Sequence, residues 1–238
     1  MDCDIENKTK CLYEKCIKNL DLKSAKLGDE FYYDNLTFCL IDAVFSMGIR
    51  YKIVQNAITR YKNYISEKGF NFNEHKISDF KKIVDSFSCE EDKKYLLVSE
   101  NILTKNRTSP KNGILKTEAC YRIAEILINN HIETKEQFNS MPKDIMESVK
   151  KEISNVKGQS SGIMLEYLYM LAGNDDICKP DRHLHKFVET TTGEQEDNST
   201  IQNLMKNVTD ILKKDFPNLT VRLLDYEIWK FQKKSKRS

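Results

Sequence analysis

The sequence is poor in the residues that interrupt helices, with only 8 glycines and 4 prolines among 238 residues. Charged residues make up 31% of the chain and apolar residues 39%, so it can bury a core and is typical of a globular protein. Long stretches run without a breaker. This composition favours helices over a sheet sandwich, and we expect an all-α fold.

A large net charge is also missing: 38 Lys and Arg residues against 36 Asp and Glu residues give a net charge of +2. No global field attracts a polyanion, so any nucleic acid must be held by a local patch. No apolar run is long enough to cross a bilayer, and no charged segment followed by an apolar one opens the chain. We expect a cytoplasmic protein with no membrane partner.

The seven cysteines are odd in number and form no Cys-x-x-Cys pair, so free thiols are the simplest interpretation. Cys3, Cys11 and Cys16 gather near the N-terminus, where they could bind a metal or a cluster. No His or fourth Cys stands beside them at ligand spacing. We therefore predict no metal site.

Apolar residues at helical spacing divide the chain into helices and loops. We expect one helix and a tether in residues 1–30, and a buried helix over "NLTFCLIDAVFSM" that Asp34 or Asn35 caps and Gly48 ends. Turn residues predict loops over 104–113 and 191–200. Further helices are predicted over 51–65, 76–100 (two or three), 115–130, 134–156 (two), from about 201, and near the C-terminus before a basic tail.

Two glycines and two serines lie between two predicted helices, in "NVKGQSSGIMLEYL". Small residues let the backbone turn tightly, which leaves amides at the start of the second helix free to face a phosphate. This helix-hairpin-helix pattern predicts sequence-independent DNA binding through Gly158, Gln159, Ser160, Ser161 and Gly162. A tight turn between two packed helices needs the same glycines, so that interpretation stays open. Lys157 could neutralise a phosphate beside the turn or be a solvated helix end.

Asp181 directly precedes the helical pattern "RHLHKFV", where it is expected to cap the helix. The helix dipole and the free amides favour its ionised form. Most such aspartates are only caps. A carboxylate held charged near a phosphate-binding hairpin can also stabilise an oxocarbenium-like sugar and orient or deprotonate an attacking water.

The hairpin, the apolar helix and an Asp-x-His about twenty residues after the small residues together resemble the helix-hairpin-helix DNA glycosylases, the endonuclease III-like base-excision enzymes. Gly158 and Ser160 fall on the two hairpin glycines, Asp181 falls on the catalytic aspartate, and His183 follows as in many members. The likeness extends over about residues 35–187. It implies that the turn after Ser46 wedges into DNA beside a flipped nucleotide.

Three departures from the family pattern shape what the resemblance implies. Ser160 replaces the second hairpin glycine and requires a negative φ. The lyase lysine is missing, since Ser161, Gly162 or Ile163 stands at its position. No cysteine follows Cys178, so the four-cysteine cluster motif is absent. The resemblance implies a monofunctional enzyme without an iron–sulfur cluster, and a monovalent cation at the hairpin stays open.

Four residues near the wedge turn are further candidates. Asp42 and Ser46 lie one helical turn apart and could line a pocket for the extruded base, or Asp42 could be satisfied by a neighbouring helix end or lysine. Arg50 and Tyr51 suit insertion or stacking beside a flipped base, and would be equally ordinary as surface residues. His183 and His185 point to different sides of a helix, which argues against a shared metal.

We expect two helical lobes with a cleft between them, one from residues 35–173 and one from 1–34 with 174–238. The expected function is a monomeric DNA glycosylase that acts on double-stranded DNA, hydrolyses the N-glycosidic bond of a flipped-out damaged or modified base and leaves an abasic site. Base-excision repair and defence against modified phage DNA both stay open. The alternative is a non-catalytic helix-hairpin-helix module that only binds DNA.

Overall fold

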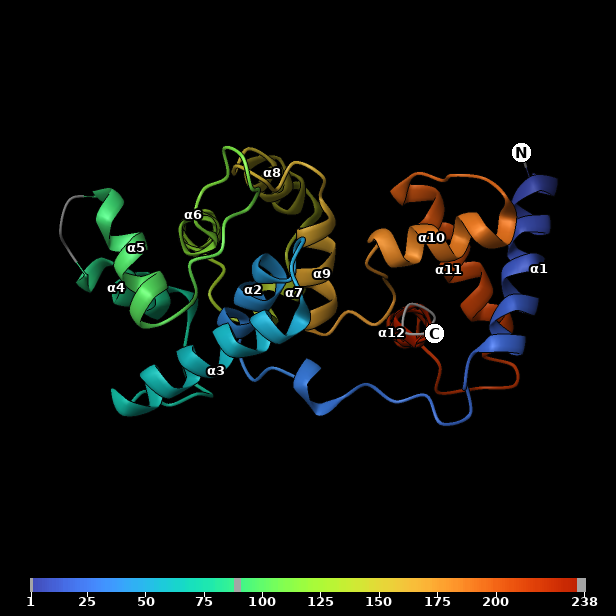
Figure 1. The fold of residues 1–238 in the computed structure, drawn as a ribbon, viewed down its shortest axis with the longest axis horizontal. Helices are drawn as coiled ribbons and strands as arrows, with labels where there is room; N and C mark the ends of the chain where they lie inside the picture. Colours follow the sequence, from blue (N-terminus) through green and yellow to red (C-terminus); the bar gives the residue numbers. More distant parts are fainter. Residues whose placement is uncertain (1, 88–90, 235–238) are drawn as a thin grey trace. The chain divides into compact units, whose positions relative to one another are not determined.

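The computed structural model describes residues 2–87 and 91–234, and this part of the chain forms twelve α-helices, one short 3-10 helix and no strand (Figure 1). The predicted all-α class is confirmed. The elements are α1 (Asp2–Asn19), η1 (Asp29–Phe31), α2 (Leu36–Phe45), α3 (Tyr51–Glu67), α4 (Ile77–Ser86), α5 (Glu91–Asn101), α6 (Lys116–Asn129), α7 (Lys135–Asn139), α8 (Lys143–Ser154), α9 (Ile163–Ala172), α10 (Arg182–Thr192), α11 (Asn198–Leu212) and α12 (Val221–Lys234).

The chain divides into two compact units. The central unit is Tyr32–Gly173, and the terminal unit combines Met1–Phe31 with Asn174–Ser238. In Figure 1 the blue α1 lies among the orange and red helices, and it packs against α10 and α11. The sequence-based borders fell after residues 34 and 173, and the structural ones fall after Phe31 and Gly173.

Helix α2 forms the core of the central unit, and all ten of its residues are buried. It packs against α3, α6 and α9, so its sequence must be apolar on every side. The Asn35 side chain accepts a hydrogen bond from the Phe38 amide at 3.1 Å, which confirms the predicted cap. The helix ends at Phe45, two residues before the predicted end, because the chain turns at once toward Gly48, whose φ is +73°.

The terminal unit is held together by apolar faces from both ends of the sequence. Leu12 and Cys16 lie four residues apart on one face of α1 and join a core formed with α10, α11 and α12. The Lys8 ammonium pairs with Glu194 and Glu196 at 2.6 and 2.7 Å. These pairs tie α1 to the connection between α10 and α11.

Candidate catalytic carboxylate and nucleic-acid interface

Asp181 is the N-cap of α10, as predicted. Its Oδ1 accepts hydrogen bonds from the amides of His183 at 2.7 Å and Leu184 at 3.3 Å. Its Oδ2 receives no hydrogen bond from any residue in the described part of the chain. Asp181 is half-buried. One oxygen therefore anchors the carboxylate to the helix, and the other is left for a further partner.

The segment before Asp181 is fixed by side chains from α11 and α12. The Gln202 side chain on α11 forms two hydrogen bonds with the Cys178 backbone. Its Oε1 accepts from the Cys178 amide at 3.0 Å, and its Nε2 donates to the Cys178 carbonyl at 2.7 Å. Asp225 on α12 accepts from the Lys179 amide at 3.2 Å, and the Asp181 amide donates to the Lys179 carbonyl at 2.6 Å. These contacts from Gln202 and Asp225, which are distant in sequence, thus fix the position of Asp181.

The carboxyl group of Asp225 has an unusual pKa. Burial, and then the negative charge of Asp181, raise its pKa to about 8, although the Lys179 amide and ammonium oppose that rise. Around neutral pH the Asp225 carboxyl is therefore mostly protonated.

This raised pKa predicts that the protein loses stability as the pH rises from about 4 toward 8. In that interval the folded state binds the Asp225 proton and the unfolded chain does not, so each step upward in pH favours unfolding. Asp225→Asn removes this titration and can still accept from Lys179. Urea unfolding should find the variant more stable than the parent at pH 8.5 and similar to it at pH 4.5. A parallel loss of stability in both proteins would contradict the assignment.

The hairpin turn connects α8 to α9, and two glycines shape it. Gly158 has a φ of +91° and Gly162, the N-cap of α9, has a φ of +75°. In the described part of the chain His131 is the one non-glycine residue with positive φ, so the φ of Ser160 is negative, as the resemblance requires. The amides of Gly158, Ser160 and Ser161 donate to no acceptor among the described residues. These three amides are open to a ligand.

Gln159 and Gly162 differ from their predicted role as phosphate-binding amides. The Gln159 amide donates to Val156 at 2.9 Å, and the Gly162 amide donates to the Gln159 carbonyl at 3.2 Å. The Gln159 side chain is only 2% exposed, with no hydrogen-bond partner for either Oε1 or Nε2 among the described residues. Gln159 is a packing residue of the turn, and its side chain cannot reach DNA in this conformation.

Gln159→Met is therefore expected to raise the free energy of unfolding by about 1 kcal/mol, because it keeps the volume and removes an unpaired buried amide. Gln202→Met is the matched control, since it removes an amide that is bonded through both groups and should lower stability. Chemical denaturation compares the three proteins. A loss of stability in Gln159→Met would mean that its amide has a partner, such as an ordered water.

The predicted wedge turn joins α2 to α3, and the buried Lys116 holds its start in place. Arg50, the N-cap of α3, is exposed, and Tyr51 is half-buried. Lys116 is 0% exposed and donates from Nζ to the carbonyls of Val44 at 2.9 Å, Phe45 at 3.0 Å and Met47 at 2.6 Å. These are carbonyls that the end of a helix leaves without partners. Lys116 thus caps α2 and fixes the start of the turn.

Asp42 lies on α2 with 0% exposure, and its Oδ2 accepts from the Tyr33 hydroxyl at 2.7 Å. Burial, the charge of Asp42 and the nearby Tyr51 and Tyr167 raise the pKa of Tyr33 far above its usual value. The structure therefore pairs Asp42 with Tyr33. The Ser46 hydroxyl instead donates to the Ala43 carbonyl at 3.2 Å, within its own helix.

Sequence reasoning missed Lys116 and Asp225. Lys116 stands on the same face of α6 as the buried Ala119, Cys120 and Ile123, and a lysine on an apolar stripe is a signal that could have been noticed. Asp225 carries no comparable signal, because acidic residues are common on helices. Its role depends on a contact with Lys179, 46 positions away.

The described histidine and cysteine side chains do not form a group that could bind a metal ion. The His185 ring pairs with Asn198 at 2.9 Å, and no group of three metal-binding side chains occurs among the described residues. Cys11, Cys16, Cys39, Cys120 and Cys178 are free thiols. The Cys3 side chain, Cys89, and the tail residues Lys236 and Arg237 lie outside the described residues.

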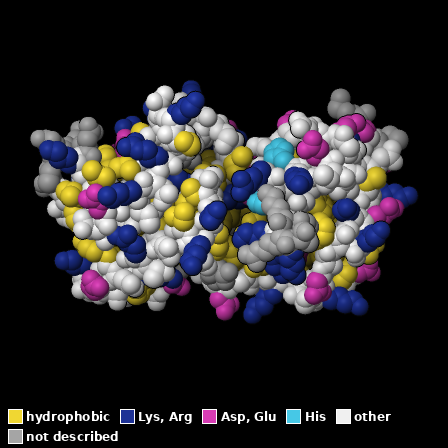
Figure 2. Space-filling view, in the orientation of Figure 1, with side chains coloured by type: hydrophobic (Ala, Val, Ile, Leu, Met, Phe, Trp, Pro, Cys, Tyr) yellow, Lys and Arg dark blue, Asp and Glu magenta, His cyan; other side chains and the backbone are white. Residues whose placement is uncertain are grey.

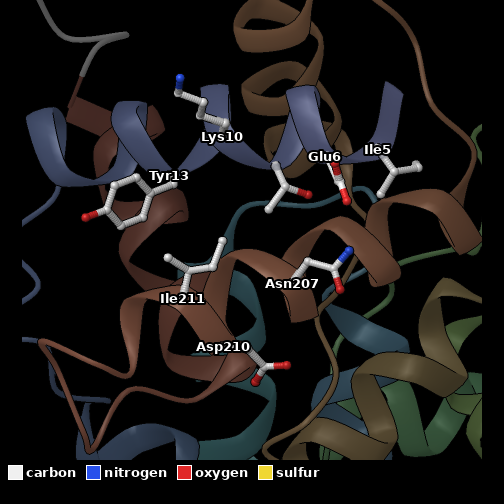
Figure 3. Close-up of a pocket in the computed structure, with 8 residues that line it drawn as sticks. Ile5, Glu6, Lys10, Tyr13, Asn207, Asp210 and Ile211 are labelled. Atoms are coloured by element: carbon white, nitrogen blue, oxygen red, sulfur yellow. The ribbon is translucent and has the colours of Figure 1, made fainter. Parts of the chain in front are cut away.

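A groove of about 510 Å³ lies between α1 and α11 (Figure 3). Ile5 and Tyr13 of α1 and Ile211 of α11 give it an apolar lining, and none of the predicted site residues lines it. Lys and Arg side chains lie on the visible surface of both units (Figure 2). No helix in the described part of the chain combines the length and the apolar character that a bilayer span needs.

A family model described as a domain of unknown function (DUF8548) matches residues 10–233, which is most of the chain. The chain belongs to this family. The DUF8548 match covers both units, apart from a few residues at either end. No curated protein and no solved structure matches the chain.

Proposed function

We propose that this DUF8548 protein is a monofunctional DNA glycosylase. The observation that carries the proposal is the state of Asp181: Oδ1 is fixed by two helix amides, and Oδ2 has no partner among the described residues. A cap alone needs one oxygen. A carboxylate that is anchored through one oxygen and offers the other suits the stabilisation of a cationic sugar.

In the proposed reaction the target nucleotide is rotated out of the duplex and its C1′ approaches Oδ2 of Asp181. The N-glycosidic bond breaks, and the base leaves with the bonding electrons and takes a proton from solvent. Water gives its oxygen to C1′ and a proton to the carboxylate, which releases it afterwards. The products are the free base and an abasic site.

Features of the central unit support the DNA-binding part of the proposal. The open amides of Gly158, Ser160 and Ser161 directly precede α9, whose N-terminal dipole favours a phosphate. The exposed Arg50 and the half-buried Tyr51 stand at a turn that the buried Lys116 holds in place, as insertion into a duplex requires. In this proposal both units engage one duplex.

The proposal is tested with the full chain and duplex oligonucleotides that carry single deaminated, oxidised, alkylated or phage-type modified bases, followed by alkali. Strand cleavage at one class of base is the expected result, and the base that is cut separates repair from defence against modified DNA. Duplex binding without cleavage of any substrate would favour the non-catalytic module. A protein that neither binds nor cleaves would overturn the function as a whole.

Helix α9 contains no lysine, so we predict that the enzyme does not form a Schiff base with the sugar. The abasic product should stay intact until alkali or heat is added, and borohydride should trap no protein–DNA adduct. Denaturing gels of the borohydride reaction measure this directly. A strong trapped band that disappears in Lys157→Ala or Lys179→Ala would identify another amine as the nucleophile.

A further inference from the structure

The loop between α5 and α6, residues 104–115, has a defined shape. Arg107 and Leu115 form a backbone bridge, and the Thr108 amide donates to the Ile114 carbonyl at 2.9 Å. The Arg107 guanidinium closes the loop by donating to the Gly113 carbonyl at 2.7 Å. A loop held in this way can present its tip to a partner with little loss of conformational entropy.

This loop is in direct contact with the hairpin turn. A Cβ built on Gly158 would lie 2.5 Å from the Cβ of Thr108, so the Thr108 side chain packs against the Gly158 backbone too closely for any side chain at Gly158. In Figure 1 the green loop before α6 runs past the turn between α8 and α9. The loop and the hairpin turn therefore form one continuous surface of the central unit.

The composite surface is basic and contains no carboxylate of its own. Residues 102–117 and 155–165 include no Asp or Glu. Lys111 at the loop tip and Lys157 in the turn are both exposed, and neither forms an ion pair with a described residue. Lys105 is different, since it pairs with Glu100 at 2.6 Å.

The surface also offers neutral donors beside these two charges. Ser109, Ser160 and Ser161 are exposed, and the open amides of the hairpin turn lie in the same region. Hydroxyls, amides and lysines that are not neutralised by carboxylates are the groups that bind phosphate oxygens. A flexible acidic peptide would need no such fixed arrangement, whereas a regular phosphate backbone suits it.

We propose that the loop 104–115 is a second backbone-binding element, which contacts duplex DNA next to the phosphate held by the hairpin turn. This inference rests on the DNA-binding function proposed above. Lys111 neutralises one phosphate, and the contact between Thr108 and Gly158 sets its spacing from the hairpin phosphate. The loop adds affinity that is independent of base sequence and sensitive to salt.

The test measures the affinity of the full chain for an unmodified duplex by fluorescence anisotropy over a series of salt concentrations. The variants are Lys111→Ala in the loop and Lys157→Ala in the turn. The matched control is Lys143→Ala, an exposed lysine at the opposite end of α8, about 16 Å along the helix axis from Ser154. Melting curves confirm that each variant is folded.

Lys111→Ala should weaken binding several-fold at low salt and reduce the slope of log affinity against log salt by about 0.9, the value for one phosphate contact. Lys143→Ala should leave the slope unchanged. An unchanged slope in Lys111→Ala together with a reduced slope in Lys157→Ala would overturn the loop proposal and leave the glycosylase proposal standing. A parent that binds no duplex, or prefers single-stranded RNA or anionic vesicles, would overturn both.

Discussion

Asp181→Asn is expected to reduce the rate of base excision by at least about 100-fold, the scale seen when one group that stabilises transition-state charge is lost. Asn is as good a helix cap as Asp, so its Oδ1 can still accept from the amides of His183 and Leu184. In the proposed reaction the substitution removes the charge that would stabilise the cationic sugar, and little else. Duplex affinity should stay the same or increase, because a carboxylate repels phosphates.

Asp197→Asn is the matched control for this experiment. Asp197 caps α11 in the same unit and accepts from the Thr200 amide at 2.7 Å, so the change is chemically identical at a second cap. Single-turnover excision rates should be normal in Asp197→Asn and very low in Asp181→Asn, with similar melting curves. Parent-like excision by a folded Asp181→Asn would make Asp181 a cap only. If that variant fails to fold, Asp181→Ser repeats the test with another strong cap.

Lys116→Met should lower the free energy of unfolding by about 3 kcal/mol. The lysine bonds three carbonyls at the end of α2, and methionine fills a similar volume while leaving those carbonyls buried and without a donor. The gain from removing a buried charge offsets part of this loss. Urea unfolding followed by circular dichroism measures the difference.

Lys135→Met provides the comparison, because that half-buried lysine donates to one carbonyl, that of Tyr33, at 2.8 Å. Lys135→Met should lower the free energy of unfolding by less than about 1 kcal/mol. If Lys116→Met is no more destabilising than Lys135→Met, Lys116 does not anchor the wedge turn. A large effect would show that Lys116 holds this exposed turn in place, which is what the proposed insertion into a duplex requires.

Local sequence was enough to predict the helical class and several helix starts. Asn35 and Asp181 are caps that can be recognised from the residues next to them, since in each case a short polar residue directly precedes apolar residues at helical spacing. The start of α11 was predicted at about residue 201, but the helix begins at Asn198. The same rule applied to Asp197 would have placed the start of α11 correctly, because Asp197 caps this helix in the same way.

The parts of the candidate site that sequence could not supply depend on distant contacts. The contact of Thr108 with Gly158 and the bond from Lys179 to Asp225 join residues about fifty positions apart. Gln159 was expected to offer its backbone amide to a phosphate, as part of a turn of small residues. The structure pairs that amide with the Val156 carbonyl and buries the side chain, because the geometry of the turn decides which amides stay open.

The discontinuous terminal unit has a consequence for the order in which the chain folds during synthesis. The central unit is continuous in sequence, and α2 and α9, near its two ends, pack together through contacts such as that of the Cys39 thiol with the Leu171 carbonyl. It can therefore complete its core while residues 174–238 are still on the ribosome. Helix α1 is made before the central unit and its partners α10 and α11 are made after it, so its apolar face stays exposed until they are complete.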